Sequence, residues 1–122
     1  MSASVLALGL LGWLAWPQAN YDSLNGEQFQ EGLQAHPDAY LLDVRTPREY
    51  ASGHLKDARN VDITQSGFKE AIAKLDTSRP VYLYCRSGAR SAKAASIAHS
   101  HAFAQVAHLS GGLRNWPGQV VR

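Results

Sequence analysis

Cysteine is almost absent from this sequence: its 122 residues include a single one, Cys85. A lone cysteine excludes an intramolecular disulfide, dithiol exchange through a C-x-x-C pair, and the zinc sites that need several thiolates. The five histidines offer no replacement, because no two of them have the H-x-x-x-H spacing that would place two ligands on one helix face. We therefore expect neither a metal nor a cofactor, and a fold held together by packing alone.

An excess of charge of one sign is also lacking. The 12 lysines and arginines nearly balance the 10 aspartates and glutamates, so the formal net charge is +2. Such a small excess does not favour nucleic acid or an anionic membrane surface as a partner. The length suits one compact domain and is too short for two ordinary ones. Neither an internal repeat nor a linker is visible.

The first part of the chain, residues 1–19, has no charged side chain, and residues 5–16 are an unbroken run of apolar residues and glycine. This run resembles the core of a signal peptide and is shorter than the roughly 20 residues that span a bilayer as a helix. No lysine or arginine precedes the run, however, and Pro17-Gln18-Ala19 is a poor cleavage pattern.

We interpret residues 1–19 as an apolar leader, either signal-peptide-like or a membrane anchor with Trp13 and Trp16 at the interface. This interpretation favours the cell envelope, with the protein either periplasmic or membrane-anchored. The alternative is a cytoplasmic protein whose apolar N-terminal helix packs on the domain. In each case residues 20–122 are long enough for a complete small domain.

Helical and strand-like segments alternate along residues 20–122. Hydrophobic spacing predicts helices at 25–33, 46–52, 66–75 and 91–98, with a last helical turn at 113–116. Strands are predicted at 39–44, 58–63, 81–84 and 105–109. This alternation implies an α/β sandwich around a parallel sheet, in which the loops at the carboxyl ends of the strands form the site.

Two helix starts carry the pattern of a capping box, in which a small polar residue and a Glu or Gln three residues later satisfy each other's backbone. Asn25 and Gln28 form the first pair, and Thr46 and Glu49 form the second. Between these helices, Asp43 stands in an otherwise apolar strand and needs a partner if it is buried. The candidates are Arg45 and an arginine of the loop after Cys85.

The loop that follows Cys85 is the most informative stretch. Four strand-forming residues (81–84) lead into the cysteine, and helix formers begin at 91. If the loop curls around its own centre, five backbone N–H groups converge above the sulfur, and the positive end of the following helix lies near it. These groups belong to Arg86, Ser87, Gly88, Ala89 and Arg90.

Such a setting favours the thiolate over the thiol, and the two guanidinium groups act in the same direction. Gly88 permits the unusual backbone angles that the loop requires. The alternative is a small buried cysteine that packs as a hydrophobic residue, which has no need of flanking arginines.

Three reactions suit a nucleophile at the base of an anion-binding loop: sulfur transfer through a persulfide, ester hydrolysis through a cysteinyl phosphate, and arsenate reduction. Cysteine phosphatases commonly have one more residue in the loop than the C-x-x-x-x-R pattern of Cys85 to Arg90. The shorter loop is better matched to one added sulfur atom. A phosphatase also needs a general acid, and nothing positions Asp43 or His54 for that role; we expect His54 to be structural.

Several separate blocks of the chain, from about 24 to 116, together resemble a rhodanese-homology domain. They are 42–47 with 49–50, 53–55 with 58 and 60–61, the loop 85–91, and 109–112 with 116. Departures at Lys56-Asp57 and Ala102 lie outside the loop. The resemblance implies a three-layer sandwich with a central parallel sheet and helices on both faces. It also implies that Asp43 and Arg45 are scaffold residues.

The same resemblance implies a single-domain sulfurtransferase of the thiosulfate:cyanide type, in which Cys85 carries the persulfide and the backbone of residues 86–90 binds the anion. The donor is then thiosulfate or a similar anion, and the acceptor is cyanide or a thiol. A persulfide carrier or regulatory binding module that acts on a protein partner is the alternative. A small cysteine phosphatase is the third hypothesis.

Overall fold

The computed structural model of this protein describes residues 20–122, which fold as a single α/β unit. The elements follow one another in the order β1 (Asp22–Leu24), α2 (Gly26–Ala35), β2 (Tyr40–Asp43), α3 (Pro47–Ser52), β3 (Arg59–Asn60), α4 (Phe68–Ala73), β4 (Val81–Tyr84), α5 (Ala89–Ser100), β5 (Val106–Leu109) and the 3₁₀ helix η1 (Gly112–Asn115).

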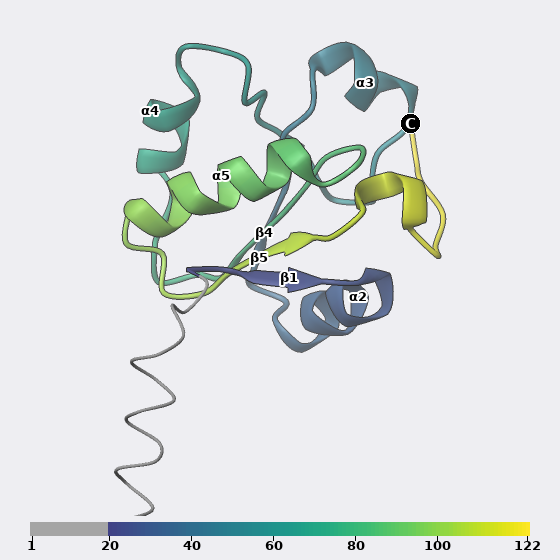
Figure 1. The fold of residues 1–122 in the computed structure, drawn as a ribbon, viewed down its shortest axis with the longest axis horizontal. Coiled ribbons are helices and arrows are strands. Elements are labelled where there is room, and N and C mark those ends of the chain that lie inside the picture. Colours follow the sequence, from purple (N-terminus) through teal and green to yellow (C-terminus); the bar gives the residue numbers. More distant parts are fainter. Residues whose placement is uncertain (1–19) are drawn as a thin grey trace, which may run out of the picture.

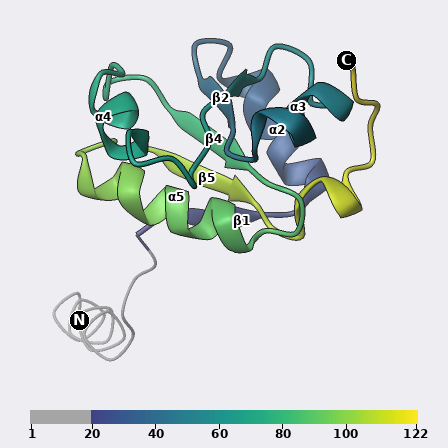
Figure 2. The same ribbon diagram turned by 90° about the horizontal axis from the view of Figure 1, so that it is seen from above.

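The five strands form one sheet in the order β1-β5-β4-β2-β3, and every neighbouring pair is parallel. Helices α4 and α5 lie on one face of the sheet and α2 lies on the other, so the molecule has three layers (Figures 1 and 2). The expected parallel sheet with helices on both faces is confirmed. Because all strands run the same way, the loops that follow them gather at one edge.

The core is divided between the two faces by the two-residue period of the strands. Val81, Leu83 and Cys85 belong to the cluster that α4 and α5 cover, whereas Tyr82 and Tyr84 belong to the cluster around α2. All four residues of β4 are buried, as expected for a central parallel strand with helices on both sides. The alternation therefore directs the thiol toward α5.

Both predicted capping boxes are present. The side chains of Asn25 and Gln28 each bond the other's backbone N–H at 2.9 Å. Thr46 and Glu49 do the same at the start of α3, where Pro47 occupies the first turn. Both helices therefore begin at the N-cap residues that the sequence indicated, Asn25 and Thr46.

Two edge strands depart from the expectation. The predicted strand 58–63 is reduced to Arg59–Asn60, after which only Val61 and Ile63 keep single backbone bonds to the β2 side. Strand β1 was missed, because its three residues include the exposed Asp22 and Ser23 and show no apolar pattern. It exists through pairing with β5, an interaction between residues about 85 positions apart.

Of the two candidate partners of Asp43, the structure selects Arg45. The Arg45 guanidinium donates to both carboxylate oxygens of Asp43, with the shortest contact at 2.7 Å, and also to the carbonyl oxygen of Gly53 at 2.6 Å. Both side chains are buried. This ion pair ties the end of β2 to the turn after α3 and so holds α3 over the carboxyl edge of the sheet.

The proposed leader, residues 1–19, lies outside the described residues. Between residues 20 and 122, no helix is long and apolar enough to cross a membrane.

Replacing Arg45 with methionine tests the buried ion pair. We expect Arg45→Met to lower the free energy of unfolding by about 3–5 kcal/mol, because it leaves the Asp43 carboxylate buried without its counter-charge. Urea unfolding followed by circular dichroism measures this. Arg48→Met, at an exposed position of α3, is the matched control, for which a change within about 0.5 kcal/mol is expected. Equal stability of the two variants would contradict the role of the pair.

Candidate active site

Cys85 lies directly after β4, at the edge of the sheet where the strands end, and its side chain is fully buried. The loop 85–88 passes between the start of α5 and η1. Backbone N–H groups of Leu113 and Arg114 in η1 donate to the carbonyl oxygens of Cys85 and Arg86 at 3.0 and 3.1 Å. The loop is therefore fixed by its connections to β4 and α5 and by these hydrogen bonds from η1.

The sulfur accepts two backbone hydrogen bonds, from Gly88 at 3.1 Å and from Ser91 at 3.4 Å, and the Ser91 hydroxyl lies 3.6 Å away. Burial raises the pKa of the Cys85 thiol, but the hydroxyl and amide of Ser91 and the amides of Gly88 and Ser87 lower it. The net effect is a pKa below that of an ordinary cysteine. The site stabilises a thiolate without exposing it.

Two glycines allow the loop to close this tightly. Gly88 has φ +106°, a left-handed conformation that side chains disfavour, and its N–H points at the sulfur. Gly112 has φ +65°, and a Cβ at this position would overlap the carbonyl group of Arg86. The turn at Ser110-Gly111-Gly112 thus packs directly against the backbone of the thiol loop.

The five loop residues expected to bind the anion do not share one environment. Gly88 is buried and donates to the sulfur, whereas Arg86, Ser87 and Ala89 are exposed. The second amide bonded to the sulfur belongs to Ser91, one position beyond the predicted set. A position on the first turn of a helix leaves its N–H free for such a bond, and this is the signal that could have identified it.

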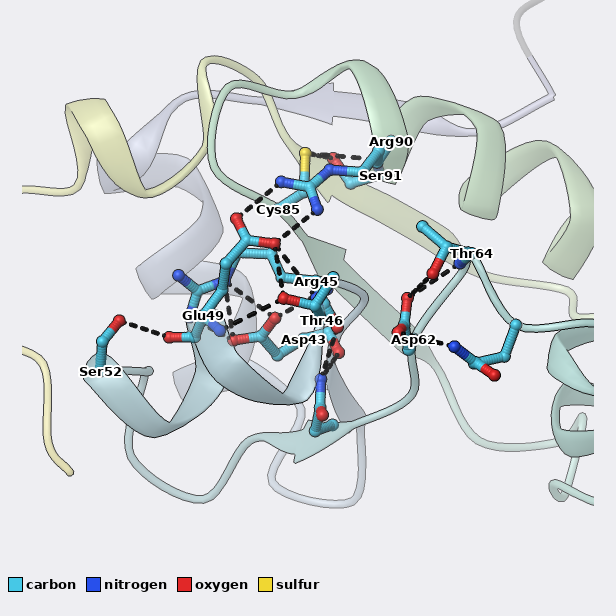
Figure 3. Close-up of polar contacts among 12 residues, drawn as sticks. Asp43, Arg45, Thr46, Glu49, Ser52, Asp62, Thr64, Cys85, Arg90 and Ser91 are labelled. Carbon is cyan, nitrogen blue, oxygen red and sulfur yellow. Dashed lines mark hydrogen bonds and ion pairs between the residues drawn. The ribbon is translucent and has the colours of Figure 1, made fainter.

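Arg90 forms a bidentate ion pair with Glu49 of α3. Its two terminal nitrogens lie 2.7 and 2.9 Å from the two carboxylate oxygens, and Figure 3 shows the guanidinium turned toward that carboxylate. The hydrogen bond from Arg90 is the main cause that lowers the pKa of Glu49, to about 2. Glu49 therefore does two things: it completes the cap of α3 and orients an arginine beside the thiol loop.

Asp43 and His54, the two residues considered as the general acid of a phosphatase, form structural contacts instead. Asp43 is bonded to Arg45, and the ring of His54 stacks on Tyr50 at 3.7 Å while its Nδ1 contacts the Tyr50 carbonyl oxygen at 2.9 Å. Within residues 20–122, no cluster of three or more His, Cys, Asp or Glu side chains is placed to hold a metal ion.

A chain of polar side chains behind the sulfur was not anticipated. Ser91 Oγ lies 2.9 Å from His108 Nδ1, and His108 Nε2 lies 3.0 Å from Ser23 Oγ. His108 is 5% exposed, and burial lowers its pKa. A histidine inside a buried apolar strand is the sequence signal that marks it, because such a group must find partners.

A cavity of about 420 Å³ lies at the opposite edge of the sheet, where the strands begin. Tyr40, Arg59 and Arg79 are among its lining residues, and both guanidinium groups lie over the tyrosine ring. Because this cavity is separated from Cys85 by the length of the strands, it is not part of the thiol site.

Comparison with known proteins agrees with the fold. The sequence profile of the Rhodanese-like domain family matches residues 25–119. The chain belongs to this family. The resemblance noted in the sequence is thereby confirmed, and so is the rhodanese-like fold.

Individual relatives of this rhodanese-like chain include sulfurtransferases. Identity is 35% to the Bacillus subtilis protein YqhL, over 80% of this chain and 74% of that protein. It is 30% to a sulfurtransferase of Allochromatium vinosum, over 78% and 87% of the two chains. It is 27% to the thiosulfate:glutathione sulfurtransferase of Saccharomyces cerevisiae, over 80% and 79%.

Among solved structures, a rhodanese-related protein of Thermoplasma volcanium has a TM-score of 0.70 and 26% identity. The match covers 83% of this chain and 98% of that one. The likeness therefore extends over almost the whole neighbouring chain.

The ion pair between Glu49 and Arg90 predicts a defined pH dependence. The pKa of Glu49 is lowered from 4.5 to about 2 in the folded protein, so its contribution to stability is present above pH 4.5 and is lost as the pH falls toward 2. We expect Glu49→Gln to be less stable than wild type by about 0.5–1 kcal/mol near neutral pH, since the pair is partly exposed.

Urea unfolding at a series of pH values measures this difference, which should shrink steadily with acidification. Glu70→Gln, at an exposed position of α4, controls for the loss of one carboxylate. A stability difference that stays constant down to pH 2 would show that Glu49 acts by packing and not by charge.

Proposed function

We propose that this protein is a sulfurtransferase that takes sulfane sulfur from thiosulfate or a similar anionic donor and passes it to a thiophilic acceptor through a persulfide on Cys85. The observation that carries the proposal is the environment of the sulfur: a buried thiol of lowered pKa that receives two backbone N–H bonds. The sulfurtransferases among its relatives support the same class of reaction.

In the first step, the Cys85 thiolate attacks the outer sulfur of thiosulfate. The new S–S bond forms as the bond between the two thiosulfate sulfurs breaks, and sulfite leaves with the electron pair. Charge balances, because a monoanion and a dianion give the anionic persulfide and the sulfite dianion. Oriented N–H donors suit both the thiolate and the persulfide anion, since each carries its negative charge on sulfur.

In the second step, the acceptor attacks the terminal sulfur of the persulfide. With cyanide, a C–S bond forms, thiocyanate departs, and the Cys85 thiolate is restored with its hydrogen bonds in place. A thiol acceptor would receive the sulfur in the same way and leave as its own persulfide. No general acid is needed, because the group displaced from the persulfide is the stabilised thiolate itself.

We assign the first contact with the donor to Arg86. Its side chain is exposed and forms no salt bridge within residues 20–122, whereas Arg90 already binds Glu49 through both terminal nitrogens. A free guanidinium at the loop entrance attracts an anionic donor. Arg90 contributes a second guanidinium, whose position is fixed by its two hydrogen bonds to Glu49.

Phosphatase chemistry has less support. The loop is one residue shorter than the one cysteine phosphatases commonly use, and Asp43 and His54, the acids considered for the leaving group, are engaged in structural contacts. Substantial hydrolysis of an aryl phosphate by the purified protein would reverse this preference.

For residues 1–19, which precede the described part of the chain, we propose an envelope function: they direct the protein to the periplasm or anchor it there. The support is the uncharged apolar run in the sequence. Intact mass measured on protein recovered from cells would reveal cleavage.

Replacing the nucleophile tests the mechanism. We expect Cys85→Ser to retain the fold and to lose thiosulfate:cyanide sulfurtransferase activity by at least about 10³-fold, because a hydroxyl forms no persulfide. Mass spectrometry of the wild-type protein after thiosulfate treatment should show a gain of one sulfur atom, and the single cysteine makes its position unambiguous. Full turnover by the variant would refute the persulfide mechanism.

The acceptor decides between an enzyme and a carrier. Slow turnover with cyanide and small thiols, combined with fast transfer to a protein thiol, would identify a persulfide carrier. Absence of any sulfur gain on Cys85 would instead indicate a regulatory binding module.

Neutralising Arg86 tests donor binding. We expect Arg86→Met to raise the KM for thiosulfate about tenfold with little change in kcat, the size of effect that loss of one hydrogen bond to a charged group produces. Lys93→Met removes one positive charge from an exposed position of α5 and is the matched control. An equal change in KM for both variants would mean that net charge, and not Arg86, binds the donor.

A further inference from the structure

A continuous chain of hydrogen-bonding side chains connects the buried thiol with the protein surface. From the Cys85 sulfur it runs 3.6 Å to Ser91 Oγ, 2.9 Å to His108 Nδ1 and, from the other ring nitrogen, 3.0 Å to Ser23 Oγ. Cys85, Ser91 and His108 are buried, and Ser23 is exposed. The four residues come from four separate segments: the end of β4, α5, β5 and β1.

The parallel sheet places these groups in line. In β5, Val106 belongs to the cluster beneath α4 and α5, and the two-residue period directs His108 to that same side, where it meets Ser91 of α5. In β1, Ser23 is the register partner of His108. The Tyr21 ring and the imidazole pack in a T-shaped arrangement, with 5.3 Å between the ring centroids.

Donor and acceptor roles follow from the state of the sulfur. A thiolate can only accept, so Ser91 donates its single hydroxyl proton to it. Ser91 Oγ must then accept from Nδ1–H of His108, and Nε2 accepts from the Ser23 hydroxyl. The carbonyl oxygen of Gly88, 3.2 Å from Ser91 Oγ, is the competing acceptor, but a hydrogen bond to an anion is the stronger one.

When the sulfur is protonated, every one of these bonds can reverse. The S–H donates to Ser91 Oγ, Ser91 donates to Nδ1, and Nε2–H donates to Ser23. Moving each proton one position outward converts this arrangement into the thiolate arrangement and releases one proton from Ser23 to solvent. The imidazole stays neutral in both states and changes only its tautomer, in agreement with its burial.

We propose that His108 is a positioning residue that sets the protonation state of Cys85 through Ser91 and relays the thiol proton to the surface at Ser23. The inference rests on the proposed sulfur transfer, whose first step requires the thiolate of a cysteine that solvent does not reach. Its function would be to remove the thiol proton before a donor reaches the sulfur.

Other titratable and charged groups surround this chain of bonds. Tyr21 packs against His108, while Arg90 and its partner Glu49 lie on the thiol side. Arg90 interacts electrostatically with Cys85. None of these groups forms a hydrogen bond with His108 Nδ1 or Nε2. The effect of His108 can therefore be separated from theirs by changing His108 alone.

Two substitutions of His108 distinguish its hydrogen bond to Ser91 from simple packing. The Asn side chain places an amide near the position of Nδ1 and keeps the bond to Ser91, whereas the Gln side chain reaches the position of Nε2 and keeps only the bond to Ser23. The ultraviolet absorbance of the thiolate, titrated below the pH of tyrosine ionisation at about 10, measures the Cys85 pKa in each variant, and the protein has no second cysteine.

We expect His108→Gln to reduce the thiolate fraction below the titration midpoint about tenfold, the effect of losing one hydrogen bond in a chain to a charged group. His108→Asn should remain within about twofold of wild type. Packing alone predicts the reverse order, because Asn leaves the larger void. Equal pKa values in both variants, or a larger change with Asn, would overturn the proposal. His101→Asn, at the end of α5, is the control.

The tautomer provides a second, independent measurement. The ring nitrogens of His108, followed by ¹⁵N nuclear magnetic resonance, should change from the Nε2–H to the Nδ1–H form with the midpoint of the thiolate absorbance. In Cys85→Ser this change should vanish. One tautomer throughout the wild-type titration would refute the relay.

Neither measurement uses sulfur transfer. Persulfide formation with thiosulfate in a protein whose His108 tautomer never changes would refute the relay and leave the proposed function intact. If the tautomer of His108 changes as expected but Cys85 takes up no sulfur, the relay stands and the proposed function is refuted.

Discussion

A negative charge on a buried sulfur is tolerable only if hydrogen-bond donors surround it, and the site of this protein is organised by that requirement. Burial by itself works against the thiolate of Cys85, yet the amides of Gly88 and Ser91 and the Ser91 hydroxyl more than compensate. The loop must therefore keep its shape, which explains why η1 holds the carbonyl groups of Cys85 and Arg86 and why no side chain fits at Gly112.

The parallel sheet supplies the other half of the arrangement. Parallel strands bring their carboxyl ends to one edge, so the thiol loop after β4 and the ion pair between Arg90 of α5 and Glu49 of α3 lie at the same edge. The buried pair of Asp43 and Arg45 holds α3 there by bonding the Gly53 carbonyl oxygen. Helix α3 in turn carries Glu49, which binds Arg90. The buried Asp43–Arg45 pair therefore helps to fix the position of an arginine beside the thiol loop.

Most of the fold and the position of Cys85 at the end of a buried strand could be predicted from the sequence because their signals are local. A strand of buried residues, a cysteine and a helix start occupy successive positions, and both capping boxes join residues three apart. Strand β1 could not be predicted, because it exists through backbone pairing with β5 and not through its own side chains. The same pairing brings Ser23 to His108, and for that reason the polar chain behind the thiol was missed.

What the sequence determined by itself is the elements other than β1 and the place of Cys85 between a strand and a helix, since both depend on hydrophobic period, caps and a short loop of definite length. What the tertiary structure decided is which long side chains meet. Arg45, and not a loop arginine, binds Asp43, and Arg90 binds Glu49. An arginine reaches several residues from its own position, and only the packing of strands and helices determines which carboxylate lies within that reach.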